Sequence, residues 1–96
     1  MRLNRSVMET DQSSPFDFPC RFPIKAMGRD DGDFEATVVA IVRRHTPDLG
    51  EGAVTTQPSR GGRYLSVTVT ITATSRAQLD AIYADLTADA LVLMAL

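Results

Sequence analysis

The sequence predicts an α+β fold in two layers, with two helices on one face of a four-stranded antiparallel sheet. The segment YLSVTVTITAT, residues 64–74, alternates apolar and hydroxyl side chains, which is typical of a strand with one buried face. Two segments with apolar residues at helical spacing each lie between strand-like segments, giving two strand–helix–strand halves joined by a hairpin. This βαββαβ order is the split βαβ, or ferredoxin-like, arrangement, for which we expect the strand order 4-1-3-2.

The first strand is predicted in CRFPIKAM, residues 20–27, because apolar side chains alternate along it. Phe22, Ile24 and Ala26 point to one side of this strand. Pro23 has no N–H group to donate, which is typical of an edge strand or a bulge. The predicted strand order nevertheless places this strand inside the sheet.

The first helix is predicted to follow the turn GRDDGD, with an apolar stripe formed by Phe34, Val38, Ile41 and Val42. Asp31 and Asp33 suit its beginning and the basic residues at 43–45 suit its end, because the partial charges at helix ends favour this order. Pro47 stops the helix.

The second half begins with the short strand AVTTQ, which Pro58 closes, and SRGGR at 59–63 has the composition of a hairpin turn. The long alternating segment is the return strand. Ser75 is a predicted helix cap, and Gln78 three residues later completes a capping-box pattern. The second helix has an apolar stripe of Leu79, Ile82, Tyr83 and Leu86, and ALVLMAL at 90–96 is predicted as a last strand that is apolar on both sides.

The length of 96 residues suits one domain, which we place at 16–96 after a disordered tail at 1–15. No segment is typical of a signal peptide or a membrane span, and the single cysteine, Cys20, cannot form an internal disulfide. We therefore expect a cytoplasmic protein without a membrane partner. The net charge of −2 argues against general nucleic-acid binding, which depends on clustered positive charge.

Two surfaces are candidates for binding. The uncovered face of the sheet carries the serine and threonine side chains of YLSVTVTITAT, which we call the hydroxyl row. This face is either solvated or an interface, for instance with a second copy in a face-to-face dimer. Its candidate interface residues are Thr68, Thr70, Val92 and Met94. The fold also gathers the turn at 29–33, the hairpin at 59–63 and the connection near Asp89 at one edge. A ligand site there would use Gly28, Arg29, Asp30, Asp31, Arg60 and Arg63, and the alternative is a charged rim.

Catalytic and metal chemistry find little support in these residues. RNA binding on such a sheet needs stacking aromatics in its middle strands, where this chain has serine and threonine. A lone thiol cannot supply paired metal ligands, and the spacing of DDGD does not fit a calcium loop. Cys20 and His45 could act as a thiol–imidazole pair with a nucleophilic sulfur only if the end of the first helix approaches the start of the first strand. The alternative is that the two do not act together, Cys20 being a partly buried thiol and His45 an imidazole at the helix end. We expect no enzymatic activity and no cofactor.

The segments IKAMG, RRHTP, PSRGGRYLSVTVTITA and LMAL, in this order and spacing, resemble the YbeD-like family of small uncharacterised bacterial proteins. The resemblance runs from about Phe18 to Leu96 and implies a βαββαβ fold similar to the regulatory ACT domains. It implies no catalytic residues, and members have been labelled proposed lipoate-regulatory proteins. We therefore expect a non-enzymatic regulatory module that binds a small metabolite or reports metabolic state, as a dimer. The alternative is an adaptor that docks on an enzyme through its open sheet face or last strand.

Overall fold

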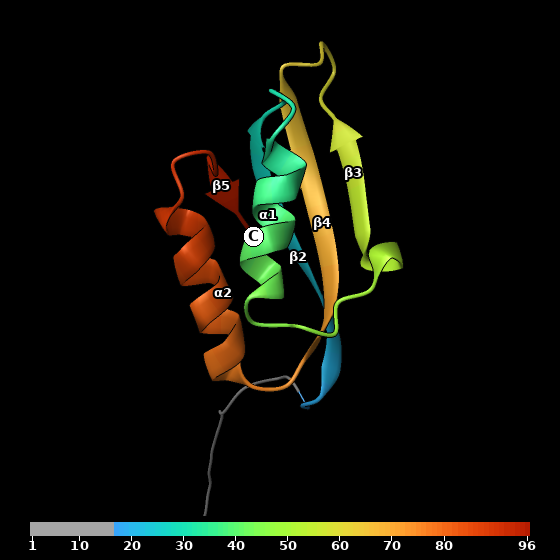
Figure 1. Ribbon diagram of the computed structural model, residues 1–96, viewed down its shortest axis with the longest axis vertical. Helices are drawn as coiled ribbons and strands as arrows, with labels where there is room; N and C mark the ends of the chain where they lie inside the picture. Colours follow the sequence, from blue (N-terminus) through green and yellow to red (C-terminus); the bar gives the residue numbers. More distant parts are fainter. Residues whose placement is uncertain (1–16) are drawn as a thin grey trace, which may run out of the picture.

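The computed structural model describes residues 17–96, so the predicted tail at 1–15 lies outside the described residues. The elements follow one another as β2 (Cys20–Arg29), α1 (Phe34–Arg43), the short 3-10 helix η2 (Glu51–Ala53), β3 (Val54–Pro58), β4 (Tyr64–Ala73), α2 (Arg76–Ala88) and β5 (Met94–Ala95). This is the predicted strand–helix–strand–strand–helix–strand order (Figure 1).

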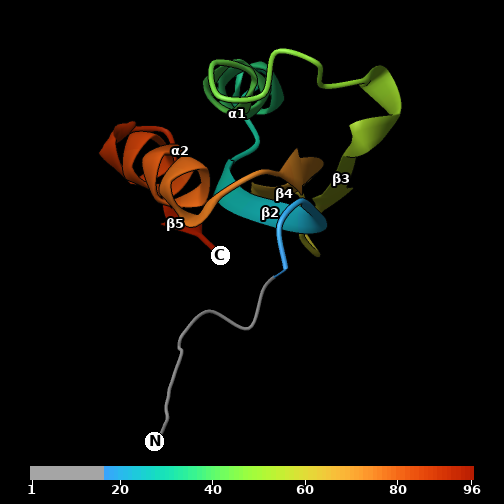
Figure 2. The same cartoon turned by 90° about the horizontal axis from the view of Figure 1, so that it is seen from below.

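The four strands form one antiparallel sheet in the order β3-β4-β2-β5, which is the predicted order. Both helices cover the same face of this sheet, as the view along the strands shows (Figure 2). The other face has no helix on it, and we call it the open face. The ferredoxin-like architecture is thereby confirmed.

The alternation in β4 sorts its side chains between the two faces as predicted. β2 pairs with β4 without a break from Cys20↔Ala73 to Arg29↔Tyr64, so the apolar residues of the two strands lie on the same face. Val67 and Val69 are completely buried under the helices, whereas Thr68 is half-buried on the open face. The predicted stripes of both helices lie in this core, except that Tyr83 packs at its edge.

Pro23 is accommodated inside the sheet because β5 is short. The backbone of Lys25 bonds to Leu96 in both directions, and Met27 accepts a bond from Leu93, so these odd positions of β2 face β5. Pro23 faces the same side, beyond the end of the paired segment. Its missing N–H therefore removes no ladder bond.

The last strand is much shorter than the apolar run ALVLMAL indicates. Only Met94 and Ala95 are strand residues, and the segment at 89–93 is irregular. Val92 turns inward there and is only 9% exposed, so its prediction as an interface residue of the open face is wrong. Met94 lies beside Met27 on the open face and is half exposed. Neither helix in the described part of the chain is long and apolar enough to cross a bilayer.

Candidate functional site

The three connections predicted to gather at one edge of the sheet do so. The backbone N–H of Asp30 donates to the carbonyl of Arg63 at 2.9 Å, which joins the turn after β2 to the β3–β4 hairpin. The carbonyl of Leu91, from the connection before β5, lies against Gly28. The acidic and basic side chains of this rim form no ion pair with each other among the described residues. Arg29, Asp30, Asp31, Arg60 and Arg63 are all exposed.

Gly28, the centre of the predicted ligand site, is buried and faces the helices. A Cβ atom at this position would lie 2.5 Å from the carbonyl oxygen of Leu91 and closer still to the ring of Phe34. The close approach that this glycine permits is therefore made by the protein's own chain. A site at this edge would have to use the exposed rim residues without Gly28.

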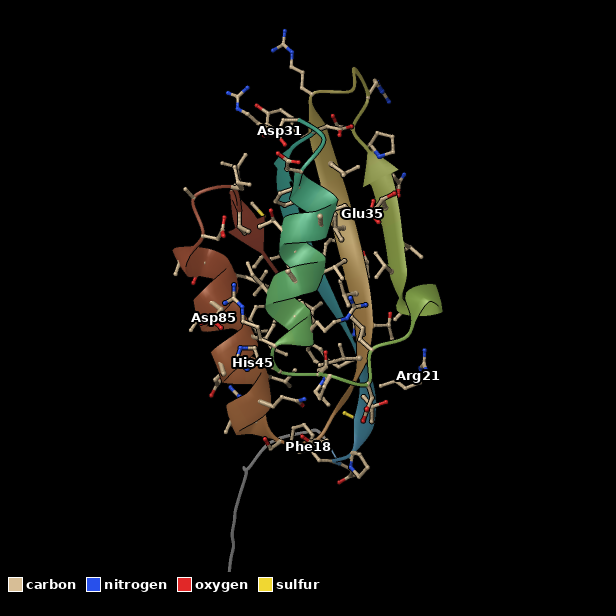
Figure 3. All side chains as sticks on the ribbon, in the orientation of Figure 1. Phe18, Arg21, Asp31, Glu35, His45 and Asp85 are labelled. Carbon is tan, nitrogen blue, oxygen red and sulfur yellow. The ribbon has the colours of Figure 1, made fainter. Side chains whose placement is uncertain are left out.

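His45, at the end of α1, pairs with α2 instead of Cys20. Its Nε2 lies 2.7 Å from Oδ2 of Asp85, and the guanidinium of Arg44 lies 3.6 Å from the same oxygen (Figure 3). Cys20 packs partly buried at the start of β2, opposite Ala73. The imidazole therefore has a structural partner that joins the two helices, and no recorded contact brings it to the thiol.

A groove opens at the opposite end of the sheet from the rim, and its origin lies in the unequal lengths of β3 and β4. β3 pairs with β4 from Pro58↔Leu65 to Val54↔Val69 only. Beyond Val69, β4 keeps β2 on one side, while the connection from α1 to β3 passes its other side without continuing the strand pairing. The space between this connection and the strand ends is a groove of about 630 Å³.

The groove walls come from four parts of the chain. The start of β2 contributes Arg21, and the end of β4 contributes Thr70 and Thr72. The connection after α1 contributes His45 and Asp48, and the start of α2 contributes Gln78. Arg21 and Asp48 contribute exposed charges of opposite sign, and the threonines contribute hydroxyls. Gly50 and Gly52 leave open space where side chains would stand. The lining thus offers hydrogen-bonding groups for a polar molecule, with apolar contact from Leu49 and Ile71.

Gln78 holds three of these walls together. Its Nε2 donates to the carbonyl of His45 at 2.9 Å, and its Oε1 accepts from the N–H of Thr74 at 2.7 Å and from the hydroxyl of Thr74 at 3.2 Å. The predicted cap is confirmed in that the Ser75 hydroxyl oxygen accepts from the Gln78 N–H. In a capping box the Gln78 side chain would accept a hydrogen bond from the backbone N–H of Ser75. Here it accepts from the backbone N–H of Thr74, at the end of β4, instead.

Gln78→Ala is expected to lower the free energy of unfolding by about 1–2 kcal/mol, because three side-chain hydrogen bonds at a partly exposed site are lost. Gln57→Ala is the matched control, since Gln57 is exposed on β3. Urea denaturation of both variants measures the difference. Equal midpoints for the two variants would show that Gln78 does not brace the groove.

Titration and metal binding add little to the description of this site. Burial raises the pKa of the Tyr83 hydroxyl above its ordinary value, but this side chain does not line the groove. Within residues 17–96, no group of three histidine, cysteine or acidic side chains is placed to hold a metal ion.

Among the groove residues named above, only Thr70 was a site residue predicted from the sequence, and it was predicted for an interface on the open face. One signal pointed to them: the five residues of AVTTQ are far fewer than the eleven of YLSVTVTITAT, so a hairpin of these two strands must leave part of the longer one unpaired. The partner of His45 had no such signal, because Asp85 is 40 positions away in the sequence.

Comparisons with known proteins agree with this fold. A solved structure of the protein HP0495 from H. pylori superposes with a TM-score of 0.66, covering 90% of this chain and 91% of that chain at 13% identity. At that identity the likeness extends to the fold alone.

Sequence relatives are closer. A UPF0250 protein of Chromobacterium violaceum is 48% identical over 89 residues, which are 93% of this chain and 100% of the relative. A UPF0250 protein of Azotobacter vinelandii is 46% identical, covering 94% of this chain and 100% of the relative. The family model described as "Protein of unknown function (DUF493)" matches residues 13–96. The chain therefore belongs to the DUF493 family, the UPF0250 proteins, which is the YbeD-like family that its motifs resemble.

Proposed function

We propose that this protein is a non-enzymatic regulatory module that binds a small polar metabolite in the groove between the α1–β3 connection and the ends of β2 and β4. The observation that carries the proposal is the groove itself. Its volume of about 630 Å³ lies within the range of about 300–1,000 Å³ that small-molecule sites occupy. Its lining is mostly polar, with apolar contact from Leu49 and Ile71, and this composition suits a polar ligand.

The lining favours a metabolite with a carboxylate. Arg21 supplies an exposed guanidinium, and the hydroxyls of Thr70 and Thr72 stand next to it on the adjacent strand, since Arg21 pairs with Thr72. A guanidinium binds a carboxylate with two parallel hydrogen bonds. Asp48, which also lines the groove, suits an amino group on the same ligand. Amino acids and related carboxylic acids such as lipoate are therefore the first ligands to test.

The groove also suits a regulatory role because it lies where separate elements meet. Gln78 and His45 connect the end of α1 with the start of α2 beside the groove. A ligand that contacts this connection and the strand ends together would bias how these elements are held. Binding free energy can shift an equilibrium only through such differential contacts.

Isothermal titration of the full chain with the amino acids and with lipoate tests this proposal. We expect binding of at least one ligand, and Thr72→Trp is expected to weaken it by about tenfold, or about 1.4 kcal/mol, because the indole would fill the groove. The matched control is Thr55→Trp, an exposed threonine on the same face of the sheet that does not line the groove. The absence of heat with every ligand, or equal weakening by both variants, would contradict a site in the groove.

A further inference from the structure

The open face of the sheet carries positive charge and no acidic side chain. The four strands contain Arg21, Lys25 and Arg29 and neither aspartate nor glutamate. These three cations lie on β2 opposite Thr72, Thr68 and Tyr64 of β4, so all three are on the open face. Each is exposed, and in the part of the chain that the structure describes none of them belongs to an ion pair.

The rest of the described chain has the opposite character. Its helices, turns and connections contain all ten acidic residues of 17–96, together with five arginines. The net charge of −2 therefore conceals a separation of charge between the strands and the segments that connect them, since seven of these ten acidic residues lie outside α1, α2 and the strands. Asp30 and Asp31 follow Arg29 at the rim, and Asp48 lines the groove together with Arg21, so Lys25 is the cation of this strand furthest from carboxylates.

Apolar side chains accompany the row of cations. Met27 stands between Lys25 and Arg29 on the same face, and Met94 pairs with it from β5 with 51% of its surface exposed. Leu96, whose backbone bonds to Lys25, is 64% exposed. A hollow of about 310 Å³ lies at the hairpin end of this region and is lined by Met27, Gln57, Pro58, Arg60, Tyr64 and Ser66, among others.

We infer that the open face docks an acidic polypeptide surface, with carboxylates opposite the β2 cations and an apolar side chain against the Met27–Met94 pair. Cations four residues apart on a strand are separated by about 13 Å, so the row matches a surface, not a single small anion. Complementary charge guides association and selects the partner. Met27 and Met94 add apolar contact area to the charge interactions of the proposed interface.

Two other occupants fit less well. A second copy placed face to face would bring two sets of unpaired cations together without a carboxylate on either sheet, and like charges brought together cost free energy. A nucleic acid would meet a face whose middle strands lack stacking aromatics, on a protein whose net charge is negative. An acidic protein surface needs neither stacking nor a net positive charge.

Fluorescence anisotropy of the full chain with a labelled glutamate-rich peptide of about 20 residues, containing leucine at every fourth position, tests this inference. We expect binding at about 50 mM NaCl that weakens at about 300 mM, because salt screens exposed charges. Lys25→Glu is expected to weaken binding by about tenfold or more, since it reverses the charge at the centre of the row. The same variant should bind a lysine-rich peptide of matched design better than the natural chain does.

Arg43→Glu is the matched control. Arg43 is an exposed arginine on α1 without an ion pair among the described residues, so its reversal makes the same change in net charge on the helix side. It should leave peptide binding within about twofold of the natural chain. Met94→Gln removes the apolar contact without adding charge and should also weaken binding.

Three results would overturn the inference. The first is no binding of the glutamate-rich peptide, and the second is equal weakening by Lys25→Glu and Arg43→Glu. The third is a different occupant: a single-stranded RNA that binds more tightly than the peptide and depends on Lys25, or a dimer in sedimentation velocity that Lys25→Glu dissociates. Lys25 does not line the groove, so these results and those of the metabolite titration can fail independently.

Discussion

Val69→Asp is expected to unfold the domain, whereas Thr68→Asp is expected to leave it folded. The two residues are neighbours in the middle of β4, but Val69 is 0% exposed beneath the helices and Thr68 lies on the open face. An uncompensated buried charge costs about 3–5 kcal/mol. That is a large part of the roughly 5–15 kcal/mol that stabilises a typical domain. A carboxylate at position 68 instead lies opposite Lys25, where a cross-strand pair of opposite charge is favourable.

Far-UV circular dichroism and urea denaturation of the two variants measure this contrast. The Thr68 variant should keep the midpoint of the natural chain or exceed it, while the Val69 variant should lack a cooperative transition. Since the two substitutions introduce the same side chain one position apart, the net charge is identical in both proteins. Similar stability of the two variants would mean that the alternation does not assign the faces of β4.

Gly28→Val is expected to destabilise the domain by at least about 1–3 kcal/mol, the usual cost of overpacking a core. The new side chain would collide with the ring of Phe34 and with the carbonyl of Leu91. The ring can move only by leaving the core, and the carbonyl belongs to the backbone segment that leads into β5. We therefore expect the substitution to loosen both the start of α1 and the last strand, which hydrogen exchange of these segments would detect.

Gly50→Ala is the control for the loss of a glycine. Its backbone has an ordinary φ of −86° and nothing stands within 4 Å of a Cβ atom there. This variant should be neutral or slightly more stable, because alanine restricts the unfolded chain. A double variant, Gly28→Ala with Phe34→Leu, should be more stable than the sum of the two single effects predicts, because the smaller side chain makes room. Strict additivity would contradict a direct clash.

Most of the fold follows from the sequence because few of its signals conflict. In β4 the alternation of valine and threonine determines which face is buried, and the pairing with β2 then follows from the matching pattern of Phe22, Ile24 and Ala26. Pro23 was the one conflict. Its resolution depends on where β5 ends, and a run such as ALVLMAL indicates burial without indicating conformation.

The candidate site was less predictable because it depends on where pairing stops and on which side chain fills a space. Gly28 was predicted as part of a ligand site, whereas in the structure Phe34 and the carbonyl of Leu91 lie against it, and the sequence does not indicate these contacts. The groove exists because pairing ends at Val54 while β4 continues to Ala73, and this end point depends on the path of the α1–β3 connection. Contacts such as His45–Asp85 arise only when the two helices are packed together.

The three cations of β2 make the open face a local region of positive potential on a chain whose net charge is −2. An anionic surface attracts this region and repels the acidic turns, so the protein turns its open face forward before contact. A net charge of −2 taken alone would make added salt speed the encounter with such a surface, by screening repulsion. The positive region acts in the opposite sense at close range, so added salt should weaken the preference for this orientation.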